Sequence, residues 1–171
     1  TFRLKHADGT WRWVEGIGTN LLHEPSVQAI VINYRDITER RNAEDELRES
    51  EERYRLLYNS SLDAILLTAP DGRILSVNPA ACRMFGRTEE EIQHLGRSGV
   101  ADLSDPRLAL ALEERARTGR FSGELTLLRE NGEKFPVEVS TAMFKDKNGD
   151  FVSSMIIRDI TERRKNAELI R

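Results

Sequence analysis

The seven residues Arg-Asp-Ile-Thr-Glu-Arg-Arg occupy positions 158–164, and the same seven residues occupy positions 35–41. The copies lie 123 positions apart, from 35 to 158, and at that offset Val14 falls on Val137. Similarity at a fixed offset indicates two copies of one structural unit. The part of the second copy that precedes residue 124 has no counterpart before Thr1, so we expect the chain to begin inside a domain.

Working outward from the second copy, a two-residue period predicts a group of strands. Apolar and polar residues alternate over 121–128 and 135–144, and a further apolar run covers 151–158, with Asn-Gly pairs between the three segments. This pattern predicts an antiparallel three-stranded meander. Two more short apolar runs, 64–68 and 73–77, flank Pro-Asp-Gly, which predicts a hairpin.

Capping patterns predict three short helices between the hairpin and the meander. Asn78 and Asp105 each precede a proline, and Thr88 has the capping-box spacing to Glu91. Basic residues such as Arg115 mark the end of the third helix. We therefore expect an α+β fold, with a five-stranded antiparallel sheet and short helices on one face. For residues 1–34 the sequence pattern predicts only a second meander.

This order of elements, together with several short motifs, resembles the PAS sensor family. The motifs are Asp-Gly-Arg-Ile at 71–74, Asn-Pro-Ala-Ala at 78–81 and both copies of Asp-Ile-Thr-Glu-Arg-Arg. The resemblance implies the C-terminal half of a first PAS domain at 1–37, a connecting helix at 38–58, a complete second PAS domain at 59–160 and the start of an exit helix at 161–171.

The PAS fold encloses a small cavity that in various members holds heme, flavin, a small metabolite or nothing, and the fold does not decide which. Inward-facing apolar residues are the candidates to line such a pocket. A filled core is the alternative, because folding needs the same residues whether or not a ligand exists. The candidates are Leu66, Val77, Met84, Phe85, Ile92, Leu125, Val137, Val139, Met155 and Ile157.

The residues that known PAS cofactors need are missing from their usual places. The light-sensing flavin members carry a reactive cysteine in an Asn-Cys-Arg-Phe-Leu-Gln segment, whereas Cys82 lies on the first short helix, where it fits a packing role. Heme-binding members supply a histidine from the long helix, and 106–118 contains none. His94 fits a surface position. Heme and covalent flavin are therefore disfavoured, no metal site is expected, and the cofactor stays unknown.

The connecting helix carries a heptad-like stripe that includes Ala43, Leu47, Tyr54 and Leu57. Such a stripe favours a weak coiled coil and hence a homodimer. A solvated helix that packs on its own domain is the alternative, because few members of the stripe are large and apolar.

Both copies of the repeat place an acidic cap where a strand runs into a helix. With almost no loop to absorb motion, these junctions are predicted to relay a signal, through Asp36, Ile37 and Thr38 in the first copy and Asp159, Ile160 and Thr161 in the second.

Composition and motifs limit the function classes. Asp and Glu number 29 against 26 Lys and Arg, a net charge of −3, which disfavours nucleic-acid binding. No apolar run approaches the roughly 20 residues that span a bilayer, so no membrane insertion is expected. The single cysteine excludes an intrachain disulfide and suits the cytoplasm. The sequence contains no phosphate-binding loop, nucleophile elbow or kinase signature, and we expect no catalysis.

The sequence thus favours a sensory module that detects a small molecule or another intracellular signal. Its output domain, such as a histidine kinase or a diguanylate cyclase, would lie elsewhere in the parent chain. A ligand-free dimerisation and spacer module for protein–protein interaction is the alternative.

Overall fold

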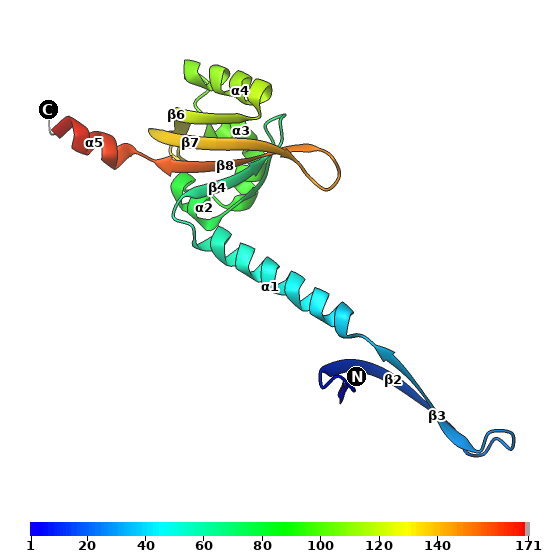
Figure 1. Cartoon of the computed structure of the whole chain (residues 1–171). Coiled ribbons are helices and arrows are strands. Elements are labelled where there is room, and N and C mark those ends of the chain that lie inside the picture. The colour runs from blue at the N-terminus through cyan, green and yellow to red at the C-terminus, as the bar shows by residue number, and fades with distance from the viewer. Residues whose placement is uncertain (170–171) are drawn as a thin grey trace. The chain divides into compact units, whose positions relative to one another are not determined.

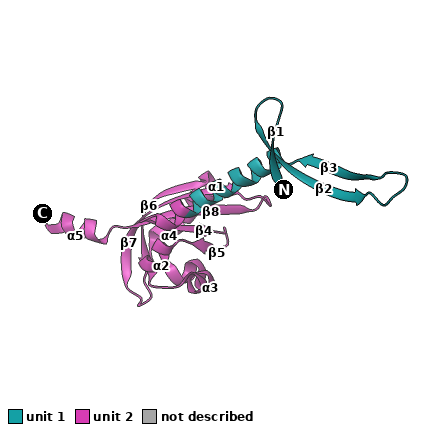
Figure 2. Ribbon diagram, turned by 90° about the horizontal axis from the view of Figure 1, so that it is seen from below, with its two compact units in different colours: residues 1–55 teal, residues 56–171 magenta. Residues whose placement is uncertain are grey.

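The computed structural model describes residues 1–169 of the chain. The chain divides into two compact units, one formed by residues 1–55 and one that begins at Leu56 (Figure 2). Helix α1 (Thr38–Ser60) runs from the first unit into the second. Among residues 1–169, no helix combines the length and the apolar character that a membrane span needs.

The first unit contains a three-stranded antiparallel meander. Its strands β1 (Phe2–Lys5), β2 (Trp11–Leu21) and β3 (Ala29–Asp36) pair in the order β1-β2-β3. Val14 is buried, whereas large apolar side chains such as Ile17 and Ile30 are exposed. The meander thus leaves much apolar surface uncovered within its own unit.

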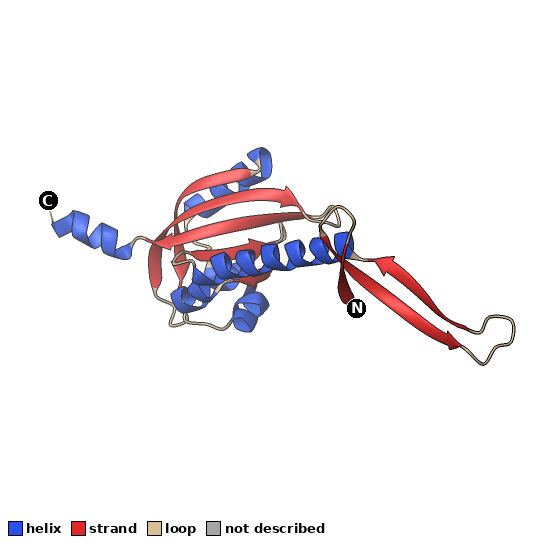
Figure 3. Ribbon diagram, turned by 60° about the horizontal axis from the view of Figure 1, so that its bottom comes forward, coloured by secondary structure: helices blue, strands red, loops and turns tan. Residues whose placement is uncertain are grey.

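The second unit contains a five-stranded antiparallel sheet (Figure 3). Its strands are β4 (Ala64–Thr68), β5 (Ile74–Val77), β6 (Arg120–Leu128), β7 (Lys134–Lys145) and β8 (Phe151–Asp159). They pair in the order β5-β4-β8-β7-β6. Figure 1 shows β4, β8, β7 and β6 in this succession. The first and last strands of the unit therefore lie side by side at the centre of the sheet, with Ala64 paired to Ile157. This pairing joins the β4–β5 hairpin and the β6–β8 meander into one sheet.

Three short helices link β5 to β6, and a fourth follows β8. The linking helices are α2 (Pro79–Phe85), α3 (Glu89–Val100) and α4 (Pro106–Thr118), and the last is α5 (Thr161–Leu169). Helix α2 contacts β4, α3 contacts β5, and α4 contacts β6 and β7. The helix expected over 161–171 is present to Leu169, and its final two positions lie outside the described residues.

The predicted caps explain why these helices begin where they do. The side chain of Asn78 accepts from the amide of Ala81. Thr88 and Glu91 form a complete capping box, and Asp105 accepts from the amide of Arg107. Each cap satisfies backbone amides that have no partner within the helix. The predicted α+β fold with its five-stranded antiparallel sheet is confirmed.

The repeat in the sequence is also a repeat in backbone pairing. Val14 pairs with Asp36 between β2 and β3, and Val137 pairs with Asp159 between β7 and β8. Both pairs obey the same offset of 123, as 14 against 137 and 36 against 159. The two meanders therefore share one register.

Candidate functional site

An internal cavity lies between the sheet of the second unit and helices α3 and α4. Its volume is about 60 Å³. That space accommodates roughly four to six water-sized groups, at about 10–15 Å³ each. The cavity is therefore small.

Six of the ten predicted pocket residues line this cavity. They are Leu66, Phe85, Leu125, Val139, Met155 and Ile157. The other four, Val77, Met84, Ile92 and Val137, belong to the surrounding core or pack against it without reaching the cavity wall. The distinction depends on which helix faces each strand residue, and the two-residue period of a strand carries no information about that.

The cavity wall also contains polar side chains that the sequence patterns did not single out as pocket residues. They are Thr68 on β4, Arg97 on α3, Arg115 on α4 and Thr141 on β7. The sequence pattern predicts for Arg115 only a place at the helix end. Its spacing from Leu108 and Ala111, seven and four residues earlier, places it on the buried face of α4, and this spacing was the available signal.

Arg115 is almost fully enclosed, with 6% of its surface exposed. Burial lowers the pKa of its guanidinium below the usual range, and the neighbouring charge of Arg97 lowers this pKa further. Removal from water disfavours the charged form of a base, and a like charge nearby does the same. Arg115 is therefore a cation in an unfavourable environment.

A kink in α3 places Arg97 at the cavity. Gly96 has φ of 62° and ψ of −163°, a backbone conformation that favours glycine. Directly after the kink, the amide of Arg97 donates to the carbonyl of Gly72 at 2.9 Å. Its guanidinium donates to the carbonyl of Pro70 at 3.2 Å. Burial lowers the pKa of Arg97 as well.

The residues weighed for cofactor chemistry lie away from the cavity wall. Cys82 is half-buried on α2, and burial raises the pKa of its thiol, which favours the unreactive protonated form. His94 is exposed on α3. Within residues 1–169, no cluster of three or more His, Cys, Asp or Glu side chains is arranged to hold a metal ion.

At the second junction, one carboxylate joins the end of β8 to the start of α5. Asp159 accepts from the amide of Thr161 at 2.8 Å and from its hydroxyl at 2.6 Å. Burial alone would raise the pKa of Asp159, but these bonds and the guanidinium of Arg129 hold it below its usual value. Ile160 is buried, and its amide donates to the carbonyl of Pro136 at 3.1 Å. The strand end and the helix start are thus fixed to β7.

The first junction has the same backbone contacts, and the hydroxyl of its threonine accepts one further hydrogen bond. The amide of Ile37 donates to the carbonyl of Trp13 at 2.9 Å, and Asp36 accepts from the amide of Thr38 at 2.9 Å. The hydroxyl of Thr38 accepts from the amide of Trp13 at 2.9 Å. The repeat places Pro136 opposite Trp13, and proline has no amide hydrogen to donate. The hydroxyl of Thr161 therefore lacks the amide donor that the hydroxyl of Thr38 has.

Asn78 connects the end of α1 to the sheet of the second unit. It is fully buried, and its amide group donates to the carbonyls of Tyr58 and Asp63, each at 3.1 Å. Its oxygen accepts from the amides of Ile65 and Ala81 at 2.9 Å and 3.0 Å. The sequence indicated the cap on α2 but not the link to α1.

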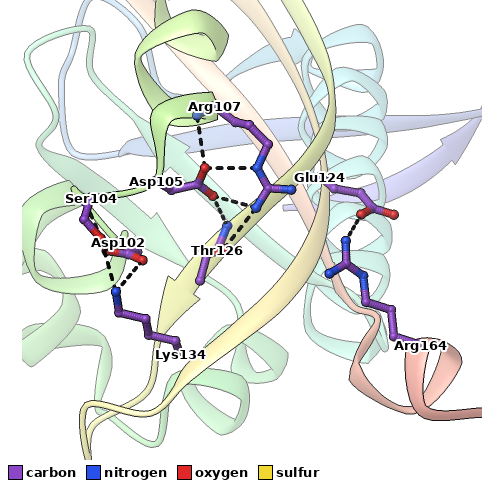
Figure 4. A network of polar contacts seen from close by, with 8 residues as sticks. All are labelled: Asp102, Ser104, Asp105, Arg107, Glu124, Thr126, Lys134 and Arg164. Atoms are coloured by element: carbon purple, nitrogen blue, oxygen red, sulfur yellow. Dashed lines mark hydrogen bonds and ion pairs between the residues drawn. The ribbon is translucent and has the colours of Figure 1, made fainter. Parts of the chain in front are cut away.

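A polar network connects α4 and α5 to the outer strand β6 (Figure 4). Asp105 forms an ion pair with Arg107 at 2.7 Å and accepts from the amide of Thr126 at 2.9 Å. Glu124, two residues earlier on the same strand, pairs with Arg164 of α5. Strand β6 therefore contacts both a helix of the cavity wall and the helix that leaves the domain.

The four residues predicted to form a dimer seam all lie on α1 and are exposed. Ala43 is small, whereas Leu47, Tyr54 and Leu57 expose 62%, 61% and 66% of their surfaces. No residue of α1 is buried. The apolar side chains of this helix thus remain accessible to a partner.

Comparison with known proteins agrees with this architecture. The chain is 29% identical over 140 residues to sporulation kinase E of Bacillus subtilis, covering 80% of this chain and 18% of that protein. It is 29% identical over 127 residues to the sensor histidine kinase TmoS of Ectopseudomonas mendocina, covering 71% of this chain and 13% of that protein. The chain spans less than a fifth of either relative.

Solved structures and a family profile give the same answer. The PAS domain of an HTR-like protein from Haloarcula marismortui superposes with a TM-score of 0.58 at 26% identity, over 70% of this chain and 99% of that one. A PAS domain from a two-component sensor histidine kinase superposes with a TM-score of 0.56 at 23% identity, over 67% of this chain and 98% of that one. The profile of the PAS domain family matches residues 62–162, and the chain therefore belongs to the PAS domain family.

Proposed function

We propose that this chain is a sensory module in which a small-molecule or other intracellular signal acts at the cavity of the second unit. Helical linkers relay the signal to an output domain, such as a histidine kinase or a diguanylate cyclase. One observation carries the proposal: β8 supplies Met155 and Ile157 to the cavity wall and ends at Asp159, the cap of α5. A shift of this strand on ligand binding reaches the helix start within two residues.

The junction contacts support a mechanical relay. Ile160 is buried and Asp159 bonds to both Thr161 and Arg129, so the helix start has little freedom to move independently of the strand. Arg164 of α5 pairs with Glu124 of β6 as well. A small displacement of the sheet therefore biases the position of α5, which is how a local event becomes a change in the output domain.

The relay is tested in the parent protein with its output domain attached. Asp36→Ala and Asp159→Ala should each change the ratio of output activity with and without stimulus while the fold stays intact by circular dichroism. Glu90→Ala, at an exposed carboxylate of α3, is the matched control and should leave the ratio unchanged. An unchanged ratio in both junction variants would show that the junctions are structural caps only.

We also propose a homodimer formed through Ala43, Leu47, Tyr54 and Leu57. The exposure of the three large side chains supports it, because apolar surface on a helix gains free energy when a second helix covers it. The same exposure favours the second candidate function, a ligand-free dimerisation and spacer module. Native mass spectrometry and visible absorbance of the purified protein separate the two: a bound small molecule or chromophore supports the sensor, and an empty dimer supports the spacer.

The domain assignment and the cellular setting belong to the same proposal. Residues 1–37 are proposed as the closing half of a first PAS domain, supported by the register that the two meanders share. We assign residues 38–58 to the connecting helix, 59–160 to the complete second domain and 161–171 to the exit helix. A cytoplasmic location is supported by the single cysteine. The module binds and relays without a reaction of its own, which the absence of a catalytic sequence motif supports.

A further inference from the structure

The cavity of the second unit contains a buried cation that has no counter-ion among the described residues. Arg115 keeps 6% of its surface exposed and lines the cavity from α4. Within residues 1–169, its guanidinium has no carboxylate partner, and the only charge that acts on its pKa is the cation of Arg97. A charged side chain that is buried without a partner is strongly unfavourable unless something else neutralises it.

Arg97 brings a second positive charge to the same wall. Its single side-chain hydrogen bond within the described residues goes to the carbonyl of Pro70, which leaves other guanidinium N–H groups available. Asp71 is the carboxylate that acts on its pKa, and Asp71 is itself bonded to Arg73 at 2.7 Å. Among the described residues, neither cavity arginine therefore has a carboxylate as its own ion-pair partner.

Two threonine hydroxyls add hydrogen-bonding capacity to the wall. The hydroxyl of Thr141 is buried and has no hydrogen-bond partner within residues 1–169. Across the described part of the chain, the hydroxyl of Thr68 has only the sulfur of Met155 as a partner, at 3.8 Å. Buried polar groups are nearly always hydrogen-bonded, so an unpartnered hydroxyl in a wall that also contains two arginines indicates a missing acceptor.

The apolar residues of the cavity wall limit the kind of anion that fits. They have aliphatic and aromatic side chains and include Leu66, Leu108 and Phe121. A fully polar anion such as phosphate would lose its hydration against these groups, whereas a carboxylate with a hydrocarbon part would place each part against a matching surface. The volume of about 60 Å³ limits the guest to roughly four to six non-hydrogen atoms.

We propose that this cavity binds a short-chain carboxylate, whose charged group pairs with Arg115 and Arg97 and whose hydrocarbon part packs against Leu66 and Leu108. A guanidinium presents a planar pair of N–H donors that matches a carboxylate, and the hydroxyl of Thr141 supplies one more donor. The inference rests on the proposed sensory function and names the chemical class of its signal.

The test uses the whole chain, labelled with ¹⁵N, and sodium butyrate as the probe. Titration at constant ionic strength should shift the amide resonances of Val139, Thr141 and Met155 saturably, with a dissociation constant in the millimolar range or below. Butyramide has nearly the same shape without the charge and should bind at least about tenfold more weakly, because it cannot form charge-assisted bonds. Inorganic phosphate should leave these resonances unshifted.

Substitutions separate a binding role of Arg115 from a structural one. Arg115→Met should weaken butyrate binding at least about tenfold and leave the thermal midpoint of the free protein equal or higher, because an apolar side chain replaces an unpaired buried charge. Arg115→Lys should keep part of the affinity, since it retains the charge without the planar pair of donors. Arg117→Met, at an exposed arginine of the same helix, is the matched control and should change neither quantity.

The outcomes distinguish this inference from the sensory proposal. Equal binding of butyrate and butyramide, or full butyrate affinity in both Arg115→Met and Arg97→Met, overturns the carboxylate site while a cavity sensor remains. Absence of butyrate binding to the wild-type chain also overturns it. The sensory proposal fails separately: Val139→Phe fills the cavity, and a parent protein with this substitution that still responds normally to its stimulus does not sense through the cavity.

Discussion

The guanidinium of Arg129 lies 2.6 Å from the carboxylate of Asp159, and this ion pair joins the residue directly after β6 to the last residue of β8. The other oxygen of Asp159 bonds to both the amide and the hydroxyl of Thr161. One side chain therefore serves two elements: it caps α5 and attaches that cap to the outer part of the sheet.

Asp159→Ala should lower the free energy of unfolding by about 1–3 kcal/mol, because it removes both the helix cap and the ion pair. Asp159→Asn keeps an oxygen for the amide of Thr161 and loses only the charge, so its effect should be smaller. Urea unfolding followed by circular dichroism measures both. Equal stability of the alanine variant and the wild type would contradict the role of the carboxylate.

Asp105 should contribute to acid sensitivity. Hydrogen bonds from Arg107 hold the pKa of its carboxyl well below the ordinary value of 3.8. A carboxyl whose folded pKa lies below its unfolded pKa stabilises the fold above the unfolded value, and this stabilisation is lost as the pH falls through the folded value. Asp105→Asn should therefore be less stable than the wild type above about pH 4, and the two stabilities should converge in stronger acid.

Urea unfolding at a series of acidic pH values checks this expectation, with the exposed carboxylate of Glu90 changed to Gln as the control. A constant difference in stability between Asp105→Asn and the wild type across the series would show that the loss comes from the hydrogen bonds alone and not from the titration of Asp105.

Ile157 and its neighbour Ile156 form a matched pair on opposite faces of β8. Ile157 is 1% exposed and lines the cavity, whereas Ile156 is 48% exposed. Ile157→Ala should cost about 2–4 kcal/mol, near the lower end of the usual range because the side chain already borders empty space. Ile156→Ala should cost less than about 1 kcal/mol. Chemical denaturation of both variants decides whether the sheet has the stated orientation, since a similar loss in both would contradict it.

Asn78→Ala should be far more damaging than the loss of an ordinary cap. The buried side chain makes four hydrogen bonds, to Tyr58, Asp63, Ile65 and Ala81. Its removal leaves several buried backbone groups without partners, at an estimated cost of about 2–4 kcal/mol. Thr88→Ala, at the exposed cap of α3, should cost about 1 kcal/mol and serves as the comparison. Thermal unfolding with equal midpoints for the two variants would refute the special role of Asn78.

Leu47→Glu should weaken self-association by placing a charge in the proposed helix seam. Leu103→Glu changes a leucine of similar exposure outside α1, 65% against 62%, and should leave association unchanged. Light scattering over a range of protein concentrations measures both variants against the wild type. A wild-type chain that stays monomeric at high concentration, or two variants with the same behaviour, would contradict the seam.

Much of the fold could be predicted from the sequence because its signals are local. The caps at Asn78, Thr88 and Asp105 each depend on residues within three positions, so their geometry follows from the chain itself. The turn at Gly132, with φ of 80°, follows from Asn-Gly in the same way. The repeat then identified the two meanders without any knowledge of their pairing.

The candidate site could be predicted only in part. Alternation along β7 identified Val137 and Val139 as inward-facing, and both are buried, but only Val139 reaches the cavity. For Arg115 the sequence predicts only a helix-end position, because basic side chains commonly occupy the last turn of a helix. Its place in the cavity wall depends on the packing of α4 against β6 and β7, which no local pattern encodes.

The sequence by itself determined the order of the elements, their caps and the two strand-to-helix junctions, because each follows from backbone preferences within a few residues. The tertiary structure alone decided that Arg97 and Arg115 meet Thr141 around one small cavity, and that Asn78 joins α1 to the sheet. These groups come from separate elements, and they approach one another only when the sheet closes through β4 and β8. Side-chain packing between distant segments, rather than any local preference, places these arginines in the cavity wall.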